Sequence, residues 1–365
     1  MQPLFKNKRI LITGACGTVG SELVRQLLTL DRYAPEEIVG IDNNESELFF
    51  LDQRYLNDSR TRFFVADIRD RDELTRKMAG IDIVFHAAAL KHVILCERSP
   101  DQAVQNNING VQNVISAALS ADVEKVIFTS SDKAVNPTNV MGTSKLMGER
   151  LMTAANSNKR GNGPVFASTR FGNILGSNGS VMPIFHNQIA KGGPVTLTSR
   201  EMTRFVMSIE ESVRLVIDSA LQARGGEVFI TKMPVVRIEG LARAMIDELA
   251  PKYGHKPEDI ELTEIGTKPG EKLYEELMSP EETRRAVELP RYFSVLPAFR
   301  GIYHDINYDY DDIVDSDVSN PYVSEQETPL TVGEIRVLLK EYGLLDEPVE
   351  GTTERYWPGD KEEKN

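Results

Sequence analysis

The sequence predicts an α/β protein in which a doubly wound parallel sheet is joined to a smaller, mixed α/β lobe. From residue 9 onward, short β-rich runs alternate with helix-length segments of amphipathic periodicity. This alternation is typical of a parallel sheet covered by helices. After about residue 172 it gives way to connections rich in glycine, proline and serine, with single helices between them. That change indicates a second, less regular lobe.

The expected elements follow one another along the chain. Strands are expected at residues 9–13, 37–42, 61–66, 81–86, 125–130 and 164–170. Helices are expected at residues 17–30, 45–55, 71–79, 100–121, 139–155, 209–223 and 331–342. The strand segments are short apolar runs rich in β-branched and aromatic side chains, whereas the helical segments carry apolar residues at helical spacing.

Composition excludes several classes of protein. With 365 residues the chain is long enough for about two domains, and its 41% hydrophobic and 27% charged residues are in the usual globular range. A net charge of −13 disfavours general binding to nucleic acid or anionic lipid. Two cysteines, Cys16 and Cys96, favour a reducing compartment, and no apolar run reaches the roughly 18 residues of a membrane helix. We therefore expect a cytoplasmic protein that is neither exported nor membrane-anchored.

An acidic stretch near the C-terminus is expected to be a solvated surface. It lacks the glycine and the terminal glutamate of a helix–loop–helix calcium loop. No cluster of histidine, cysteine and aspartate has metal-ligand spacing elsewhere, so no metal site is expected. The stretch contains Asp305, Asp309, Asp311, Asp312, Asp315 and Asp317.

A glycine-rich loop follows the first strand and opens the first helix. Gly14, Gly17 and Gly20 are spaced G-x-x-G-x-x-G, with Thr18 and Val19 between the last two. Glycine lets the backbone turn sharply and approach a pyrophosphate, whose charge is met by free amides at a helix N-terminus. The spacing alone also fits a tight strand-to-helix turn. The preceding strand, the following helix and a later acid favour a Rossmann-type dinucleotide site.

That later acid is Asp42, at the end of the second strand and 22 residues after Gly20. A carboxylate at this point accepts hydrogen bonds from the adenosine ribose hydroxyls and would repel a 2′-phosphate. No lysine or arginine occurs from residue 43 to residue 53, so the sequence favours NAD over NADP. The alternative is that Asp42 caps a helix or a turn.

Other residues around the expected NAD site are less distinctive. Asp67 and Ile68 follow the third strand, where Asp67 either faces the adenine or caps the next helix. Ala87, Ala88 and Ala89 follow the fourth strand, and their small side chains leave room for a flat cofactor. Close helix packing would use the same small residues.

These patterns suggest a division of the chain. We expect a dinucleotide-binding domain at residues 1–172, with returning segments at about 204–250. Residues 173–203 and 251–300 are expected to form a substrate-binding lobe, and residues 301–365 an acidic C-terminal extension, which covers that lobe or a subunit interface.

The segment after the fifth strand contains Ser131, Asp132 and Lys133, and the next helix contains Met141 and Lys145. Together with the glycine loop and Asp42, these residues resemble the extended short-chain dehydrogenase/reductase superfamily, and within it the UDP-N-acetylglucosamine 4,6-dehydratases. The resemblance covers about residues 7–295. It continues through the motifs Ala88-Ala-Leu-Lys91-His92, Asn107-Ile-Asn-Gly110, Arg170-Phe-Gly-Asn173, Gly176-Ser-Asn-Gly179-Ser180-Val181-Met-Pro183, Met202-Thr-Arg204-Phe205 and Lys268-Pro-Gly-Glu271-Lys272.

The resemblance implies a sequence of steps on the sugar. Oxidation at C4, with hydride transfer to tightly bound NAD, makes the C5 hydrogen acidic because it is then α to a ketone. A base removes the C5 proton and an acid protonates the departing C6 hydroxyl. The hydride then returns to C6, which yields a UDP-2-acetamido-2,6-dideoxy-4-keto-hexose.

The resemblance assigns these steps to neighbouring residues. Asp132 is expected to be the acid toward the C6 oxygen and Lys133 the base toward C5, which requires the pKa of Lys133 to fall toward neutrality. Ser131 is expected to hydrogen-bond the C4 oxygen. Lys145 is expected to hold the nicotinamide ribose and to favour loss of the C4 proton; the group that finally accepts this proton stays open. A surface charge pair is the alternative for Asp132 and Lys133.

Met141 departs from the usual pattern of the superfamily. Most members have tyrosine four residues before the lysine, so that both side chains lie on one helix face. A thioether cannot transfer a proton, so a tyrosine-based mechanism is excluded at this position. Some members of the resembled dehydratase family also have methionine here. We expect Met141 to be a packing residue at the substrate site, with a steric role only.

The resemblance also implies the residues that contact the nucleotide sugar, and a homo-oligomer. The sequence leaves open a GDP- or dTDP-activated sugar as substrate, a nucleotide-sugar C4 epimerase, and a non-catalytic NAD-binding sensor or assembly protein. It also leaves open retention or inversion at C5. The implied substrate contacts are Lys91, Met141, Asn173, Gly179, Ser180, Val181, Arg204 and Glu271.

Overall fold

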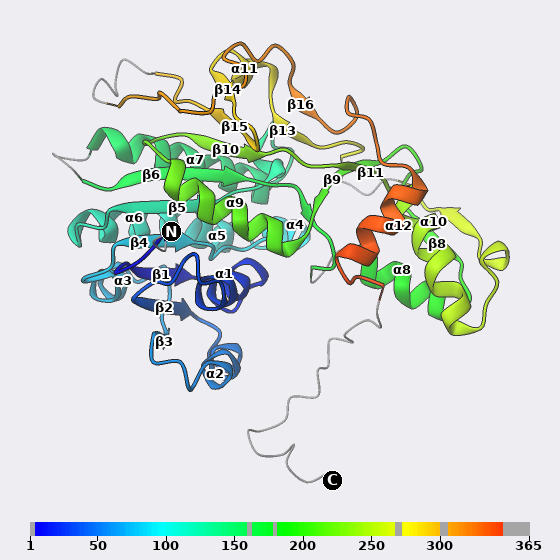
Figure 1. The fold of residues 1–365 in the computed structure, drawn as a ribbon, viewed down its shortest axis with the longest axis horizontal. Coiled ribbons are helices and arrows are strands. Elements are labelled where there is room, and N and C mark those ends of the chain that lie inside the picture. The colour runs from blue at the N-terminus through cyan, green and yellow to red at the C-terminus, as the bar shows by residue number, and fades with distance from the viewer. Residues whose placement is uncertain (1–3, 159–162, 178–180, 267–271, 300–305, 346–365) are drawn as a thin grey trace, which may run out of the picture.

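The computed structural model describes residues 4–158, 163–177, 181–266, 272–299 and 306–345 (Figure 1). Its larger body contains a nine-stranded sheet with the strand order β14-β15-β10-β6-β5-β4-β1-β2-β3. Strands β1 to β6 and β10 are parallel, while β15 is antiparallel to β10 and β14 is antiparallel to β15. The bounds are β1 Arg9–Thr13, β2 Glu37–Asp42, β3 Thr61–Val65, β4 Ile83–His86, β5 Lys125–Thr129, β6 Val165–Arg170, β10 Val228–Thr231, β14 Ala286–Glu288 and β15 Tyr292–Val295. The predicted α/β class is confirmed.

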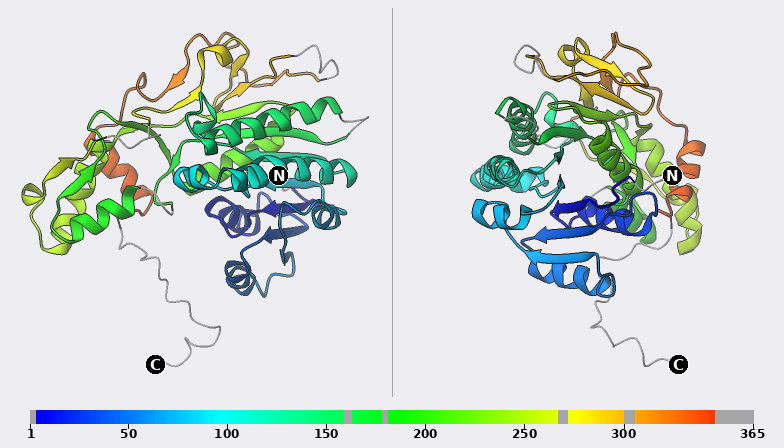
Figure 2. Two further views of the ribbon diagram at one scale, coloured as in Figure 1. Left: turned by 180° about the vertical axis from the view of Figure 1, so that it is seen from behind. Right: turned by 60° about the vertical axis from the view of Figure 1, so that its left-hand side comes forward.

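Helices cover both faces of this sheet, as the right-hand view of Figure 2 shows. Ile10 and Ile12 of β1 join one core with helices α1, α2 and α9, whereas Leu11 joins a second core with α3, α6 and α7. Strands buried on both faces have nearly continuous apolar runs, which explains the β1 sequence. The bounds are α1 Thr18–Thr29, α2 Glu45–Arg54, α3 Arg71–Met78, α6 Gly110–Ser120, α7 Val140–Asn158 and α9 Ile209–Gln222.

The single helix expected at residues 100–121 is interrupted. Helix α5, Pro100–Ala103, continues into a π-helical turn at Val104–Asn109 before α6 begins, and a short helix, α4, precedes it at Val93–Arg98. The buried Asn107 side chain in this turn bonds both backbone groups of Leu90 and the hydroxyl of Ser144. The π-turn thus ties the loop after β4 to α7, a contact that periodicity does not predict.

The smaller body lies to the right in Figure 1 and has its own apolar core, formed mainly by α8, α10 and α12. A three-stranded sheet, β11-β9-β7, and the pair β12–β8 complete it. The bounds are α8 Val181–Ala190, α10 Ile238–Leu249, α12 Val332–Glu341, β7 Asn173–Ile174, β8 Val195–Leu197, β9 Thr203–Met207, β11 Val235–Arg237 and β12 Leu262–Glu264.

The structure divides the chain differently from the expected ranges. Helix α9 and strand β10 return to the large sheet, but α10, also within 204–250, packs against α8 and α12 in the smaller body. Conversely, β14 and β15, within 251–300, extend the large sheet. Helical periodicity gives α10 an apolar face but does not indicate which body buries it.

The C-terminal segment contacts both bodies. In α12, Ile335 and Leu339 are buried against α10, whereas the Tyr310 hydroxyl donates to the buried Glu227 near the large sheet. Strand β16, Tyr322–Val323, pairs with β13, Glu276–Met278, which leads into the short helix α11, Pro280–Thr283. Asp309, Asp311, Asp312, Asp315 and Asp317 are exposed, and Asp305 lies outside the described residues.

Membrane crossing would need a longer apolar helix than the described part of the chain contains.

Candidate active site

A cavity of about 180 Å³ lies at the carboxyl ends of β1 and β4. The chain leaves these adjacent parallel strands toward opposite edges of the sheet, and such a reversal is where open α/β sheets bind ligands. Seven of the expected NAD residues line it, from the carboxyl ends of β1, β2, β3 and β4 and the loops after them: Gly14, Gly17, Asp42, Ile68, Ala87, Ala88 and Ala89. The cavity is lined by Gly14, Gly17, Ile41, Asp42, Asn43, Ala66, Ile68, Ala87, Ala88, Ala89, Leu90 and Asn106.

The three glycines of the first loop serve different purposes. Gly14 has a φ of 70°, and a Cβ there would lie 2.7 Å from the Ala88 nitrogen. A Cβ on Gly20 would lie 2.0 Å from the Gly14 oxygen, so Gly20 permits close packing of loop and helix. Gly17 is exposed, and its nearest contact would be 3.3 Å. Gly17 thus lines the cavity where α1 begins, and this N-cap residue makes no side-chain cap; Thr18 and Val19 follow it but are not among the lining residues.

Asp42 lines the same cavity and is tied to the glycine loop. One carboxylate oxygen accepts from the Cys16 amide and the other from the Asn44 amide, each at 3.0 Å. The cap of α2 is Asn44, which accepts from the Glu47 amide, so Asp42 does not cap this helix. Burial raises the pKa of the Cys16 thiol to about 12, and Asp42 adds to the shift. Cys16 is therefore a neutral thiol at physiological pH.

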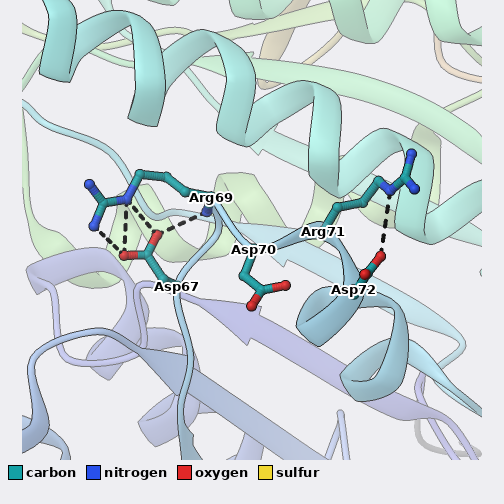
Figure 3. A pocket seen from close by; sticks show the side chains of 5 residues that line it. All are labelled: Asp67, Arg69, Asp70, Arg71 and Asp72. Carbon is teal, nitrogen blue, oxygen red and sulfur yellow. Dashed lines mark hydrogen bonds and ion pairs between the residues drawn. The ribbon is translucent and has the colours of Figure 1, made fainter.

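Asp67 does not line this cavity in the structure. Its carboxylate is turned to the guanidinium of Arg69, at 2.6 Å in the shortest contact, beside a shallow surface pocket (Figure 3). The cap of α3 is Asp70, which accepts from the Glu73 amide at 2.9 Å. Asp67 thus does not cap the helix, and it is Ile68 that lines the cavity.

Ser131, Asp132 and Lys133 form a tight cluster directly after β5. The Ser131 hydroxyl donates to Asp132 Oδ1 at 2.6 Å, and Lys133 Nζ donates to both Asp132 oxygens at 3.1 Å. Asp132 is 4% exposed, and burial by itself would raise its pKa. Lys133 and the Ser131 hydroxyl outweigh burial and lower it, so Asp132 is a carboxylate.

The structure does not give Lys133 the lowered pKa that its expected role as a base requires. Burial alone would lower the pKa of Lys133, but the carboxylates of Asp132 and Glu275 raise it above the usual value. Lys133 is therefore an ammonium ion in this site.

Met141 and Lys145 lie one turn apart on α7, with different surroundings. Lys145 Nζ donates to the Thr129 carbonyl at 2.9 Å and lies 4.7 Å from the centre of the Phe128 ring. Burial lowers the pKa of Lys145 to about 8. Met141 is 3% exposed and packs with Cys96 and Ala103 in a small apolar cluster. In this structure its contacts are those of a core side chain.

Glu275 is a site residue that the sequence did not indicate. It is 5% exposed and joins the Asp132–Lys133 pair to Asn173 and Arg204 of the smaller body. Asn173 Nδ2 donates to both of its oxygens at 2.8 Å, and Arg204 Nε and Lys133 Nζ lie 3.3 and 3.9 Å from Oε1. Burial raises the pKa of Glu275 to about 7; Asp132 adds to the shift, and Arg204 and Lys133 oppose it. Two adjacent glutamates in the segment around Glu275 were the only sequence signal, and nothing local distinguishes the buried one.

A second cavity, of about 320 Å³, lies in the smaller body beside Glu275. Asn173, Val181 and Arg204 are among its lining residues, together with apolar side chains of α8, α10 and β9. Lys91 lies exposed in the loop after β4. Gly179, Ser180 and Glu271 lie outside the described residues. Within the described ranges, no group of three or more histidine, cysteine, aspartate and glutamate side chains could hold a metal ion.

Sequence comparison identifies related proteins. A family model described as polysaccharide biosynthesis protein matches residues 10–297. An "Uncharacterized membrane protein" of Methanocaldococcus jannaschii is 52% identical over 293 residues, covering 80% of this chain and 87% of that protein. A "UDP-N-acetylglucosamine 4,6-dehydratase (inverting)" of Campylobacter jejuni is 37% identical, covering 81% and 85%. A "UDP-glucose 4-epimerase" of Rickettsia canadensis is 38% identical, covering 84% and 86%.

Structure comparison finds the same architecture. The structure of Pen from Bacillus thuringiensis is 38% identical with a TM-score of 0.84, covering 94% of this chain and 99% of that chain. A dTDP-glucose 4,6-dehydratase of Streptomyces venezuelae, solved with NAD bound, is 24% identical with a TM-score of 0.62, covering 73% and 86%. At that identity the second likeness concerns the fold alone.

Proposed function

Because the chain belongs to the polysaccharide biosynthesis protein family, we propose that it is an NAD-dependent 4,6-dehydratase of UDP-N-acetylglucosamine. The observation that carries this proposal is the Ser131–Asp132–Lys133 cluster at the carboxyl edge of the sheet. A carboxylate and an ammonium in contact, next to a buried lysine, supply the proton donors and acceptors that elimination requires. A relative with this activity is 37% identical along most of the chain.

NAD fits the first cavity on the chain's own residues. The open start of α1 at Gly17 suits a pyrophosphate, the Asp42 carboxylate suits ribose hydroxyls, and Ala87 and Ala88 leave room for a flat ring. NAD held there would supply the acceptor for the C4 hydride and the donor that returns this hydride to C6. Lys145, which reaches the same strand edge, is then the residue that holds the nicotinamide ribose.

Ser131 and Asp132 offer a path for the C4 proton that needs no tyrosine. A C4 hydroxyl bound to Ser131 passes its proton through the Ser131 hydroxyl to Asp132 Oδ1, 2.6 Å away. Protonated Asp132 then donates to the departing C6 oxygen. The proton lost at C4 is thus the one that leaves in water, and Asp132 ends as the carboxylate it was. Met141 stands where most members of the superfamily have tyrosine, and this proton transfer does not require it.

Lys133 is the base toward C5 in this scheme, and it later returns the proton to C5. Its amine acts only after the ammonium has given up its proton, because the resting pKa of Lys133 is raised by Asp132 and Glu275 against the effect of burial. The nucleotide end of the substrate occupies the second cavity, where Arg204 and Asn173 are the polar lining residues nearest to Glu275.

The proposed reaction is tested by incubating the protein with UDP-N-acetylglucosamine in deuterium oxide and following the sugar by proton NMR. We expect a new C6 methyl signal and deuterium at C5, because elimination exchanges the C5 proton with solvent. The coupling pattern at C5 reports retention or inversion. GDP- and dTDP-activated sugars serve as alternative substrates. If protein that binds NAD forms no methyl product from any of them, the dehydratase proposal fails.

The same experiment distinguishes a dehydratase from the second candidate, a C4 epimerase. A relative named UDP-glucose 4-epimerase is 38% identical over most of this chain, which favours C4 epimerisation as the alternative. An epimerase keeps the C6 hydroxyl and changes only the C4 configuration. A product with inverted C4, no methyl signal and no deuterium at C5 would favour the epimerase.

A further inference from the structure

The proposed mechanism needs a group that accepts the ammonium proton of Lys133, and Glu275 lies beside this ammonium. Lys133 must lose a proton before it can act at C5, yet Asp132 is a poor acceptor for that proton because Lys133 and Ser131 stabilise its carboxylate. Asp132 is also committed to the C4 proton. A second carboxylate contacts the same ammonium, since Oε1 of Glu275 lies 3.9 Å from Lys133 Nζ.

We propose that Glu275 is a positioning residue that accepts the ammonium proton of Lys133 and so frees Lys133 to act as the base at C5. The inference rests on the proposed dehydratase function. Glu275 does not touch the reacting atoms in this scheme; it acts through Lys133.

The surroundings of Glu275 suit this exchange. The charged groups that face it are Asp132 and Lys133 from the turn after β5 and Arg204 from β9. Neutral donors hold the carboxylate in place, namely Asn173 from β7 and the Phe205 amide at 3.2 Å. Its backbone amide donates to the Ser324 hydroxyl at 2.9 Å. Glu275 is 5% exposed, and a buried carboxyl group binds a proton more tightly than an exposed one.

The proton count balances over one turnover. Lys133 first transfers its proton to Glu275, and Asp132 then receives the C4 proton through Ser131. Lys133 takes the C5 proton while Asp132 gives its proton to the C6 oxygen. Lys133 next returns a proton to C5, and finally recovers its first proton from Glu275. All groups end as they began, and no co-reactant is needed beyond NAD.

A variant at Glu275 should separate oxidation from elimination. We expect Glu275→Gln to oxidise C4, seen as absorbance of reduced nicotinamide on mixing with substrate, but to lower C5 deuteration and methyl formation by about 100-fold. Glu275→Asp, which keeps an acceptor, should recover part of the elimination. Equal loss of oxidation and elimination in Glu275→Gln would mean a structural role and would overturn the proposal.

The pH dependence gives a second readout. Glu275 must be ionised to accept the proton, so the wild-type elimination rate should rise with pH through about 7, where its pKa lies. Glu275→Gln should lose this rise. Glu276→Gln is the matched control, because the neighbouring carboxylate binds Lys272 and Asn136 instead, and the rise should persist there.

Infrared titration of the unliganded protein tests the contact without any turnover. We expect a carboxylic acid band that disappears near pH 7, is absent in Glu275→Gln, and shifts to higher pH in Lys133→Met because a stabilising cation is lost. A band unaffected by Lys133→Met would overturn the proposed coupling. If the wild type forms no methyl product but the band behaves as expected, the dehydratase proposal fails while the proton-sharing pair stands.

Discussion

At the scale of single residues, the cofactor site depends on which glycine faces which neighbour. A Cβ on Gly20 would lie 2.0 Å from the Gly14 oxygen, whereas a Cβ on Gly17, which lines the cavity, would lie 3.3 Å from the same oxygen. The two positions look alike in the sequence pattern. Substitution of Gly20 should therefore impair folding, whereas substitution of Gly17 should impair NAD binding.

We expect Gly17→Ala to fold but to bind NAD at least about tenfold more weakly, since a methyl group would occupy space where the pyrophosphate approaches the helix. Gly20→Ala should instead reduce the yield of folded protein, because its Cβ would lie 2.0 Å from the Gly14 oxygen. Titration calorimetry with NAD and thermal unfolding distinguish these effects. Unchanged NAD affinity in Gly17→Ala would contradict the assigned site.

At the scale of elements, a buried ion network joins β6, α7 and α11. Arg170, 1% exposed, donates to Glu149 at 2.6 Å and to Glu282 at 2.8 Å, and also to the Leu277 carbonyl. Glu149 lies one turn after Lys145 on α7. The network thus anchors the helix that carries Lys145 to the segment that follows Glu275. Burial would raise the pKa of Glu282, but Arg170 lowers it to about 2.

Replacement of Arg170 by methionine should destabilise the fold by about 3–5 kcal/mol at neutral pH, because two buried carboxylates lose their cation. The lowered pKa of Glu282 contributes stability that is fully present above its unfolded value of about 4.5 and is lost as the pH falls toward 2. The difference between variant and wild type should therefore shrink at acidic pH. Urea unfolding at both pH values measures it. Arg237→Met, which removes an exposed pair with Glu201, is the control and should have little effect.

At the scale of the whole molecule, the C-terminal segment connects the two bodies. Tyr310 and Tyr322 are buried against the large body, while Ile335 and Leu339 are buried in the smaller one. The Tyr322 hydroxyl also bonds both backbone groups of Met233. Because Glu275 belongs to the strand region that pairs with β16, this segment also supports the active site.

A chain that ends at residue 305 should lose these contacts. Each large apolar side chain contributes about 1.5–3 kcal/mol on burial, so the loss is comparable to the whole stability of a typical domain. We expect this chain to aggregate or to melt at least about 10 °C below a chain that ends at residue 345. Size-exclusion chromatography and thermal circular dichroism compare the two. Equal melting temperatures would show that the segment is dispensable.

Features that depend on neighbouring residues could be predicted from the amino-acid sequence alone. The boundaries of the expected strands lie within two residues of the observed ones. For the helices that form as single elements, the boundaries lie within three residues. Apolar periodicity and helix caps such as Asn44 and Asp70 act locally, which is why these boundaries could be predicted. The cluster of Ser131, Asp132 and Lys133 and the glycine cradle are likewise local, since one strand end positions each of them.

The remaining features depend on contacts between distant parts of the chain. The sequence did not distinguish Glu275 from Glu276, yet packing buries the first beside Lys133 and directs the second to Lys272. The charge of Lys133 follows from that contact, because two carboxylates outweigh its burial. Helix α10 joins the smaller body for the same kind of reason, since its apolar face has no local preference between two cores. Burial and charge depend on distant parts of the chain, so local sequence patterns could not predict them.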